Sequence, residues 1–335
     1  MRPSQLRISI APIVFFLSLL IPFGVTTSQT TQEPGGTGQN LPQAQQPLKV
    51  ETSVVNVFAT VRDNHHALVT DLGQSDFHIY ENDQEQKIAF FSREVKLPIT
   101  LGLLVDTSGS QQNLLLLEQE AASRFIQRVL RKGDESMVMS FDVDVDLLAD
   151  FTQDTEVLER AIRKTTINAP VGLGPVQQND PRGTALYDAI YLACHDQLAS
   201  EAGRKAIVIL TDAEDVGSKV SLKDAVESAQ RADTVIHIIL VADPGQYFSQ
   251  GSFYSGADAA KKLTEETGGR VIDAKGGKKI EDAFDQISEE LRSQYVIGYY
   301  PTNGARDGSF RKIKVETTRP GLKVLARKGY YAPSK

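Results

Sequence analysis

The feature that most constrains the fold of this chain is a set of apolar runs that lack the alternation of a half-exposed strand. Three of them cover residues 99–105, 205–210 and 235–241. A strand of this kind is buried on both faces, as in a parallel sheet that is covered by helices. Between and after the runs, apolar residues recur at helical spacing. Helices are expected over residues 114–130, 155–164, 184–200, 222–232, 257–267 and 279–291.

Buried strands that alternate with helices predict an α/β fold with a doubly wound, mostly parallel sheet. We assign residues 97–292 to this Rossmann-like domain. Residues 48–96 and 293–335 flank it and have strand-like alternation instead. Because each flank is too short to form a stable domain alone, we expect the two to pair in one small β-sandwich.

The N-terminus has the pattern of an export signal. Arg2 and Arg7 precede an apolar run over residues 8–25, which is followed by small polar residues. We therefore expect residues 1–28 to be a signal peptide, and the protein to be secreted, periplasmic or on the cell surface. If the segment is not cleaved, it would instead anchor the chain in a membrane. Residues 29–47 are rich in Gln, Thr, Gly and Pro and are expected to form a disordered linker.

Charge and cysteine content exclude two classes of protein. The net charge is -7, and the chain has no long basic run, so we expect no nucleic-acid partner. The single cysteine, Cys194, cannot form an internal disulfide, which excludes a disulfide scaffold. Cys194 lies on an expected helix and is interpreted as a small core residue.

Five oxygen-bearing side chains are expected to meet at one edge of the sheet. Asp106, Ser108 and Ser110 follow the first apolar run, and Asp212 follows the second. Thr184 stands where a helix is expected to begin. Ligand sites in open α/β sheets lie at the carboxyl ends of the strands. Hard oxygens of this kind suit Mg²⁺, or else Mn²⁺ or Ca²⁺, rather than Zn²⁺.

In order and spacing these five residues resemble the metal-ion-dependent adhesion site (MIDAS) of von Willebrand factor A domains. The resemblance covers roughly residues 97–292 and implies a bound divalent cation. Where the family has Thr-Asp-Gly, this chain has Thr211-Asp212-Ala213, which puts the local turn in doubt more than the ligand. The flanks, with motifs at residues 76–81, 310–315 and 327–331, resemble those of exported bacterial proteins that carry a related domain.

The resemblance implies a protein-binding module of the adhesion type, not an enzyme, in which the cation engages a carboxylate of a protein partner. Two alternatives stay open. One is an envelope scaffold whose metal is structural or absent. The other is a metal-assisted hydrolase, for which Asp215 is the one candidate general base that we can name. No phosphate-binding loop, H-E-x-x-H or G-x-S-x-G motif is present.

Other polar clusters favour simpler interpretations. Asp142, Asp144 and Asp146 resemble the start of a calcium loop, but the required Gly and Glu are absent, so a solvent-facing hairpin turn is expected. His65-His66 is interpreted as a solvated turn. His237, inside an apolar run, is expected to be a core histidine whose ring nitrogens have hydrogen-bond partners.

Overall fold

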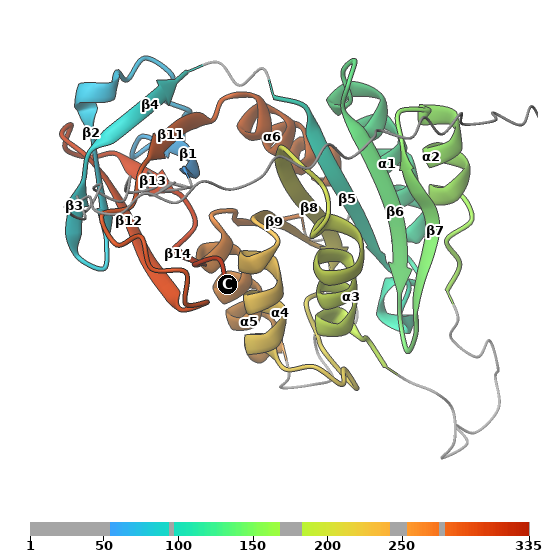
Figure 1. Cartoon of the computed structure of the whole chain (residues 1–335). Helices are drawn as coiled ribbons and strands as arrows, with labels where there is room; N and C mark the ends of the chain where they lie inside the picture. The colour runs from blue at the N-terminus through green and yellow to red at the C-terminus, as the bar shows by residue number, and fades with distance from the viewer. Residues whose placement is uncertain (1–53, 94–96, 168–182, 242–252, 275–278, 335) are drawn as a thin grey trace, which may run out of the picture. The chain divides into compact units, whose positions relative to one another are not determined.

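The computed structural model describes residues 54–93, 97–167, 183–241, 253–274 and 279–334 (Figure 1). Its six-stranded sheet has the order β10-β9-β8-β5-β6-β7. All neighbouring strands are parallel except β6 and β7, which form an antiparallel hairpin. The predicted doubly wound, mostly parallel sheet is therefore confirmed. Its strands are β5 (Ile99–Asp106), β6 (Glu135–Phe141), β7 (Val145–Thr152), β8 (Arg204–Thr211), β9 (Thr234–Leu240) and β10 (Val271–Asp273).

Helices pack on both faces of this sheet, which explains the continuous apolar runs. On one face, Leu101 and Leu103 of β5 pack in a core with α1, α2 and α6. On the other face, Leu104 packs in a second core with α3, α4 and α5. The helices are α1 (Leu115–Val129), α2 (Thr155–Ile162), α3 (Leu186–Leu192), α4 (Leu222–Arg231), α5 (Phe253–Thr267) and α6 (Ile280–Arg292).

Local sequence signals set several helix ends. The Asp154 side chain accepts hydrogen bonds from the backbone N–H groups of Glu156 and Val157, at 2.9 and 3.3 Å, and so caps α2. Ser221 and Asp224 form a reciprocal capping box at the start of α4. Gly268, at φ +89°, ends α5 in the left-handed conformation that glycine adopts without strain.

The helix expected over residues 184–200 is not a uniform α-helix. It is divided into α3 and a π-helical segment, Ala193–Leu198. Hydrophobic periodicity does not distinguish α from π geometry over so short a stretch, because both bury one stripe of side chains.

The two flanks pair with each other, as predicted. Their strands form two four-stranded sheets, β13-β1-β11-β4 and β14-β12-β2-β3, that share one apolar core. Both sheets mix strands from the two ends of the chain, for example β1 with β11 and β2 with β12. The strands are β1 (Val55–Arg62), β2 (Phe77–Glu81), β3 (Gln84–Gln86), β4 (Ile88–Ser92), β11 (Tyr295–Tyr299), β12 (Phe310–Thr317), β13 (Lys323–Leu325) and β14 (Gly329–Tyr331).

The sequence patterns missed β3 and β14, which are only three residues long each. The expected signal peptide and linker, residues 1–47, lie outside the described residues. Among the helices of the described part of the chain, none combines the length and the hydropathy needed to cross a membrane.

Candidate metal site

The predicted ligands lie where the sheet changes direction. β5 is central, with β6 on one side and β8 on the other. The chain leaves β5 toward β6 and later returns on the opposite side as β8, so the carboxyl ends of β5 and β8 lie at a topological switch point. Asp106 is the last residue of β5, and Asp212 directly follows β8. This edge therefore brings both acidic residues together.

Hydrogen bonds link four of the five predicted ligands. The backbone N–H of Ser108 donates to Asp106 Oδ1 at 2.9 Å. The hydroxyls of Ser108 and Ser110 lie 3.0 Å apart, and that of Ser110 is hydrogen-bonded to the Asp212 carboxylate. Thr211, the neighbour of Asp212 in the sequence, completes this series of hydrogen bonds, since its hydroxyl donates to Asp106 Oδ2 at 2.5 Å.

Thr184 approaches through its backbone. It exchanges two hydrogen bonds of 3.0 Å with Val216, in the loop that follows Asp212. The preceding Gly183 allows this contact, because a Cβ atom there would lie 2.8 Å from the Val216 carbonyl oxygen. The Thr184 side chain is buried, but no hydrogen bond joins it to the other four residues. The role of all five as ligands stays a prediction.

Electrostatics at this edge favour a cation. Asp106 is fully buried, and burial together with the charge of Asp212 raises its pKa to about 7. Burial also raises the pKa of Asp212. Within the described residues, no Lys, Arg or His forms an ion pair with either carboxylate. Two crowded carboxylates and nearby hydroxyls are hard oxygen donors, so this donor set fits a divalent cation.

Two buried residues beside the site were missed. Helical spacing predicts that Leu114 and Leu117 share the buried stripe of α1, but Leu117 is 47% exposed and Glu118 is fully buried. Glu118 thus lies within the apolar stripe of the helix, between Leu115 and Ala121. An acidic residue at helical spacing from these apolar residues is the sequence signal that could have revealed it. Gln111 is also fully buried, and its amide donates to Ser110 Oγ at 3.4 Å.

The aspartate cluster at the β6–β7 turn requires a correction. Asp144 is exposed in the hairpin turn, as expected, and Asp146 is exposed at the start of β7. Asp142 is buried instead, accepts a 3.3 Å hydrogen bond from the Thr107 hydroxyl, and offers its backbone carbonyl to Ala185 N–H at 2.6 Å. It connects the loop after β5 to the loop of Thr184, a tertiary role that the turn pattern alone did not indicate.

The other candidates have structural partners. Asp215 accepts hydrogen bonds from the Ser218 hydroxyl at 2.6 Å and from Tyr187 N–H at 3.1 Å. It therefore ties the loop after β8 to the start of α3. Cys194 is buried, which raises the pKa of its thiol to about 12 and makes it unreactive. His237 is buried in β9, as expected, but neither of its ring nitrogens has a hydrogen-bond partner among the described residues, so it is not the satisfied histidine that was predicted.

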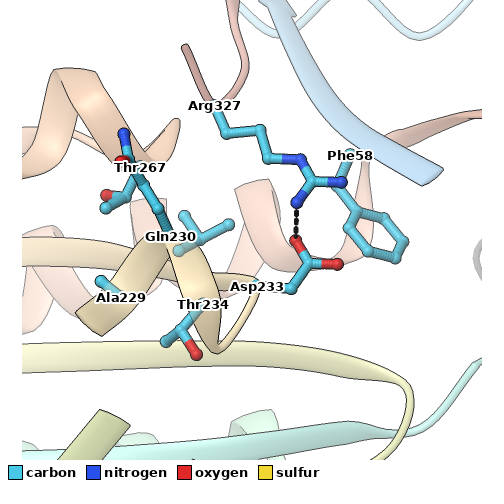
Figure 2. A pocket seen from close by; sticks show the side chains of 8 residues that line it. Phe58, Ala229, Gln230, Asp233, Thr234, Thr267 and Arg327 are labelled. Carbon is cyan, nitrogen blue, oxygen red and sulfur yellow. Dashed lines mark ion pairs between the residues drawn. The ribbon is translucent and has the colours of Figure 1, made fainter. Parts of the chain in front are cut away.

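A small pocket lies elsewhere, between the flanking strands and the parallel-sheet domain (Figure 2). Phe58 of β1 contributes to its wall, and Arg327 forms a 2.7 Å ion pair with Asp233 at its edge. None of the five predicted ligands lines it. The pocket lies where the sandwich packs against the parallel-sheet domain, and it is separate from the candidate metal site.

Comparison with known families identifies the parallel-sheet region. Residues 101–214 match the family model of the von Willebrand factor type A domain. The chain therefore contains a von Willebrand factor A domain. The matched segment of this A domain begins within β5, ends two residues after Asp212, and includes all five predicted ligands. No curated protein matches the chain.

Several solved structures resemble the chain at low sequence identity. BatB from Bacteroides thetaiotaomicron is 17% identical, with 58% of this chain and 100% of that chain covered and a TM-score of 0.44. The vWF domain of the type V pili tip protein Mfa5 from Porphyromonas gingivalis is 16% identical, with 59% and 96% covered and a TM-score of 0.44. Proximal thread matrix protein 1 from the mussel byssus, described with a zinc-occupied MIDAS motif, is 16% identical, with 63% and 49% covered and a TM-score of 0.44.

Proposed function

We propose that the A domain is a protein-binding module that holds one divalent cation and engages a carboxylate of its partner through that ion. The observation that carries the proposal is the pair of buried carboxylates, Asp106 and Asp212, joined through serine hydroxyls and without a cationic partner among the described residues. Asp106, Ser108, Ser110, Thr184 and Asp212 would hold Mg²⁺, or Mn²⁺ or Ca²⁺ in its place.

The charges of the proposed ligands support a binding role. Only two of the five, Asp106 and Asp212, are acidic, and the three hydroxyls add no negative charge, so a divalent cation would keep an attraction for a further carboxylate. When bound, the cation supplies a positive centre that attracts an external carboxylate in a partly desolvated cleft. The hydrogen bonds described above would hold the side chains of Asp106, Ser108 and Ser110 in place for the cation. We further propose that the protein acts outside the cytoplasm, because its N-terminal residues have the pattern of a signal peptide.

The test of cation binding is a titration of the full chain with Mg²⁺ and Mn²⁺ by calorimetry. Asp106→Asn keeps an acceptor oxygen for only one of the two donors, Ser108 N–H or the Thr211 hydroxyl, and it removes one charge. We expect it to weaken binding by more than about 100-fold, beyond what loss of an outer partner costs. Asp146→Asn, at an exposed position of β7, is the matched control and should bind like the wild type.

The test of the binding role uses the water proton relaxation of the Mn²⁺-loaded protein. An ion that is open to a partner keeps water, which added acetate should displace, so the relaxation enhancement should fall as acetate is added. Sodium chloride at the same ionic strength is the control. A loaded protein whose relaxation does not respond to acetate would contradict the binding role and support the scaffold, in which the cation is structural.

A further inference from the structure

Glu118 is a buried acid beside the candidate cation site. It lies in the first turn of α1, the helix that follows the Asp106–Ser110 segment. Its neighbours on the buried stripe of the helix are apolar, among them Leu115, Ala121 and Ala122. A carboxyl group transferred from water to such surroundings without a partner is strongly destabilising, so its presence requires a physical reason.

No group in the described part of the chain satisfies Glu118. Neither carboxyl oxygen has a hydrogen-bond donor, and no Lys, Arg or His forms an ion pair with it. Gln111, also buried, leaves its Oε1 atom without a donor while its amide faces Ser110. Three buried acceptor oxygens near the site are therefore without donors. A buried acceptor of this kind is normally completed by ordered water or an ion.

The charges that act on Glu118 also place it near the candidate cation site. Burial raises its pKa well above the usual range, and the negative charges of Asp106 and Asp212 raise it further. Glu118 is thus close enough to interact with both. No three acidic, His or Cys side chains in the described residues are close enough to share an ion directly. A role for Glu118 at the ion would therefore have to pass through water.

We infer that Glu118 is a third acidic residue of the cation site, which accepts a hydrogen bond from a water molecule bound to the ion. The inference rests on the proposed cation site. A cation-bound water has polarised O–H groups, the donors that the buried oxygens of Glu118 and Gln111 lack. A bound cation favours the ionised form of Glu118, and the negative charge of that form adds to the attraction of the cation, so the residue sets how firmly the site holds its ion.

Replacement of Glu118 should weaken cation binding without unfolding the protein. We expect Glu118→Gln to lower the affinity for Mn²⁺ by about 10- to 100-fold, the usual effect of losing an outer partner. Glu120→Gln removes an exposed carboxylate from the same helix, and Glu81→Gln removes a buried carboxylate from the sandwich. Both controls should bind Mn²⁺ as the wild type does.

The charge of the ion provides a second readout, which a purely structural role of Glu118 would not change. Coulombic energy scales with the ionic charge, so a tenfold loss for Mn²⁺ predicts a loss of about thirtyfold for Tb³⁺. Tb³⁺ luminescence and Mn²⁺ electron spin resonance measure the two affinities. If Glu118→Gln does not fold, Glu118→Met fills the same volume with an apolar chain and should show the same losses.

The possible failures are distinguishable. If the wild type binds neither ion, the proposed cation site is wrong. If the wild type binds both ions and the folded Glu118 variants bind them equally well, the cation site stands and the role of Glu118 is overturned. An equal loss for Mn²⁺ and Tb³⁺ would also overturn it, because the effect would then be one of geometry rather than of charge.

Discussion

At the scale of the residue, small side chains determine how closely the site loops approach each other. Gly183 lets the Thr184 backbone pair with Val216. Ala213, directly after Asp212, has φ +64°, a conformation that favours glycine. Ala213 therefore holds the turn after Asp212 in a left-handed conformation, at the expense of backbone strain.

Gly183→Ala should therefore disturb the site more than an ordinary loop substitution. The added Cβ would lie 2.8 Å from the Val216 carbonyl oxygen, which must move away and loosen the Thr184–Val216 bridge. We expect a loss of about 1–3 kcal/mol in the free energy of unfolding, as for overpacking, together with weaker Mg²⁺ binding. Urea unfolding and calorimetry measure the two effects. Gly304→Ala, where a Cβ meets nothing within 4 Å, should change neither.

At the scale of the element, one buried carboxylate joins the two sheets of the sandwich. Glu81, at the end of β2, accepts hydrogen bonds from the hydroxyls of Tyr299 in β11 and Tyr330 in β14, at 2.8 and 2.9 Å. Burial and the interaction with Glu81 raise the pKa of both tyrosines, so both stay protonated donors at neutral pH. The contact links a strand of one sheet to two strands of the other.

Tyr299→Phe should destabilise the sandwich, because Glu81 loses one of its two donors while it stays buried. The expected loss is about 1.5–3 kcal/mol, typical for a hydrogen bond to a charged group. Urea unfolding should show it, and hydrogen exchange should show faster opening of the β2 and β11 amides. Tyr300→Phe alters an exposed ring next to it in the sequence and is the control. Equal stability of the two variants would mean that Glu81 does not join the sheets.

At the scale of the whole molecule, an ionic cluster joins the sandwich to the A domain. Arg62 of β1 forms an ion pair with Glu290 of α6, which also pairs with Arg270. His237 of β9 is buried beside them, with Nδ1 3.7 Å from Glu290 Oε2. Burial lowers the pKa of His237 to about 4, although the charge of Glu290 opposes the shift. The histidine is therefore neutral in the folded protein.

This cluster predicts a loss of stability in mild acid. In the unfolded chain His237 takes up a proton near pH 6.5, whereas in the folded protein it does so only near pH 4. Between pH 4 and pH 6.5 the unfolded state thus binds more protons than the folded state. The free energy of unfolding is therefore not reduced by His237 above pH 6.5, and it decreases as the pH falls toward 4. The difference between the two pKa values of His237 corresponds to about 3 kcal/mol in the free energy of unfolding. Urea unfolding at pH 4.5 and 7 should show a smaller difference for His237→Gln than for the wild type. His195→Gln, at an exposed position, is the control.

The sequence by itself determined the local elements and the order of the candidate ligands. Buried strands and amphipathic helices have their own periods, and the Asp106–Ser110 segment and Asp212 directly follow two of the buried strands. The pairing of the flanks also followed, because neither block could bury a core alone. These properties depend on residues close in sequence or on how much surface a segment must bury.

Only the tertiary structure decided which side chains share an environment. Leu117 and Glu118 both fit a helix, and the packing of α1 on the sheet buried the acid and left the leucine half-exposed. Asp142 faces the Thr107 hydroxyl because β6 lies beside β5, and Thr184 meets Val216 because two loops converge. The pKa of Asp106 likewise depends on Asp212, which is distant in sequence. Burial and charge act through space, so a linear pattern specifies them only where the fold brings the residues together.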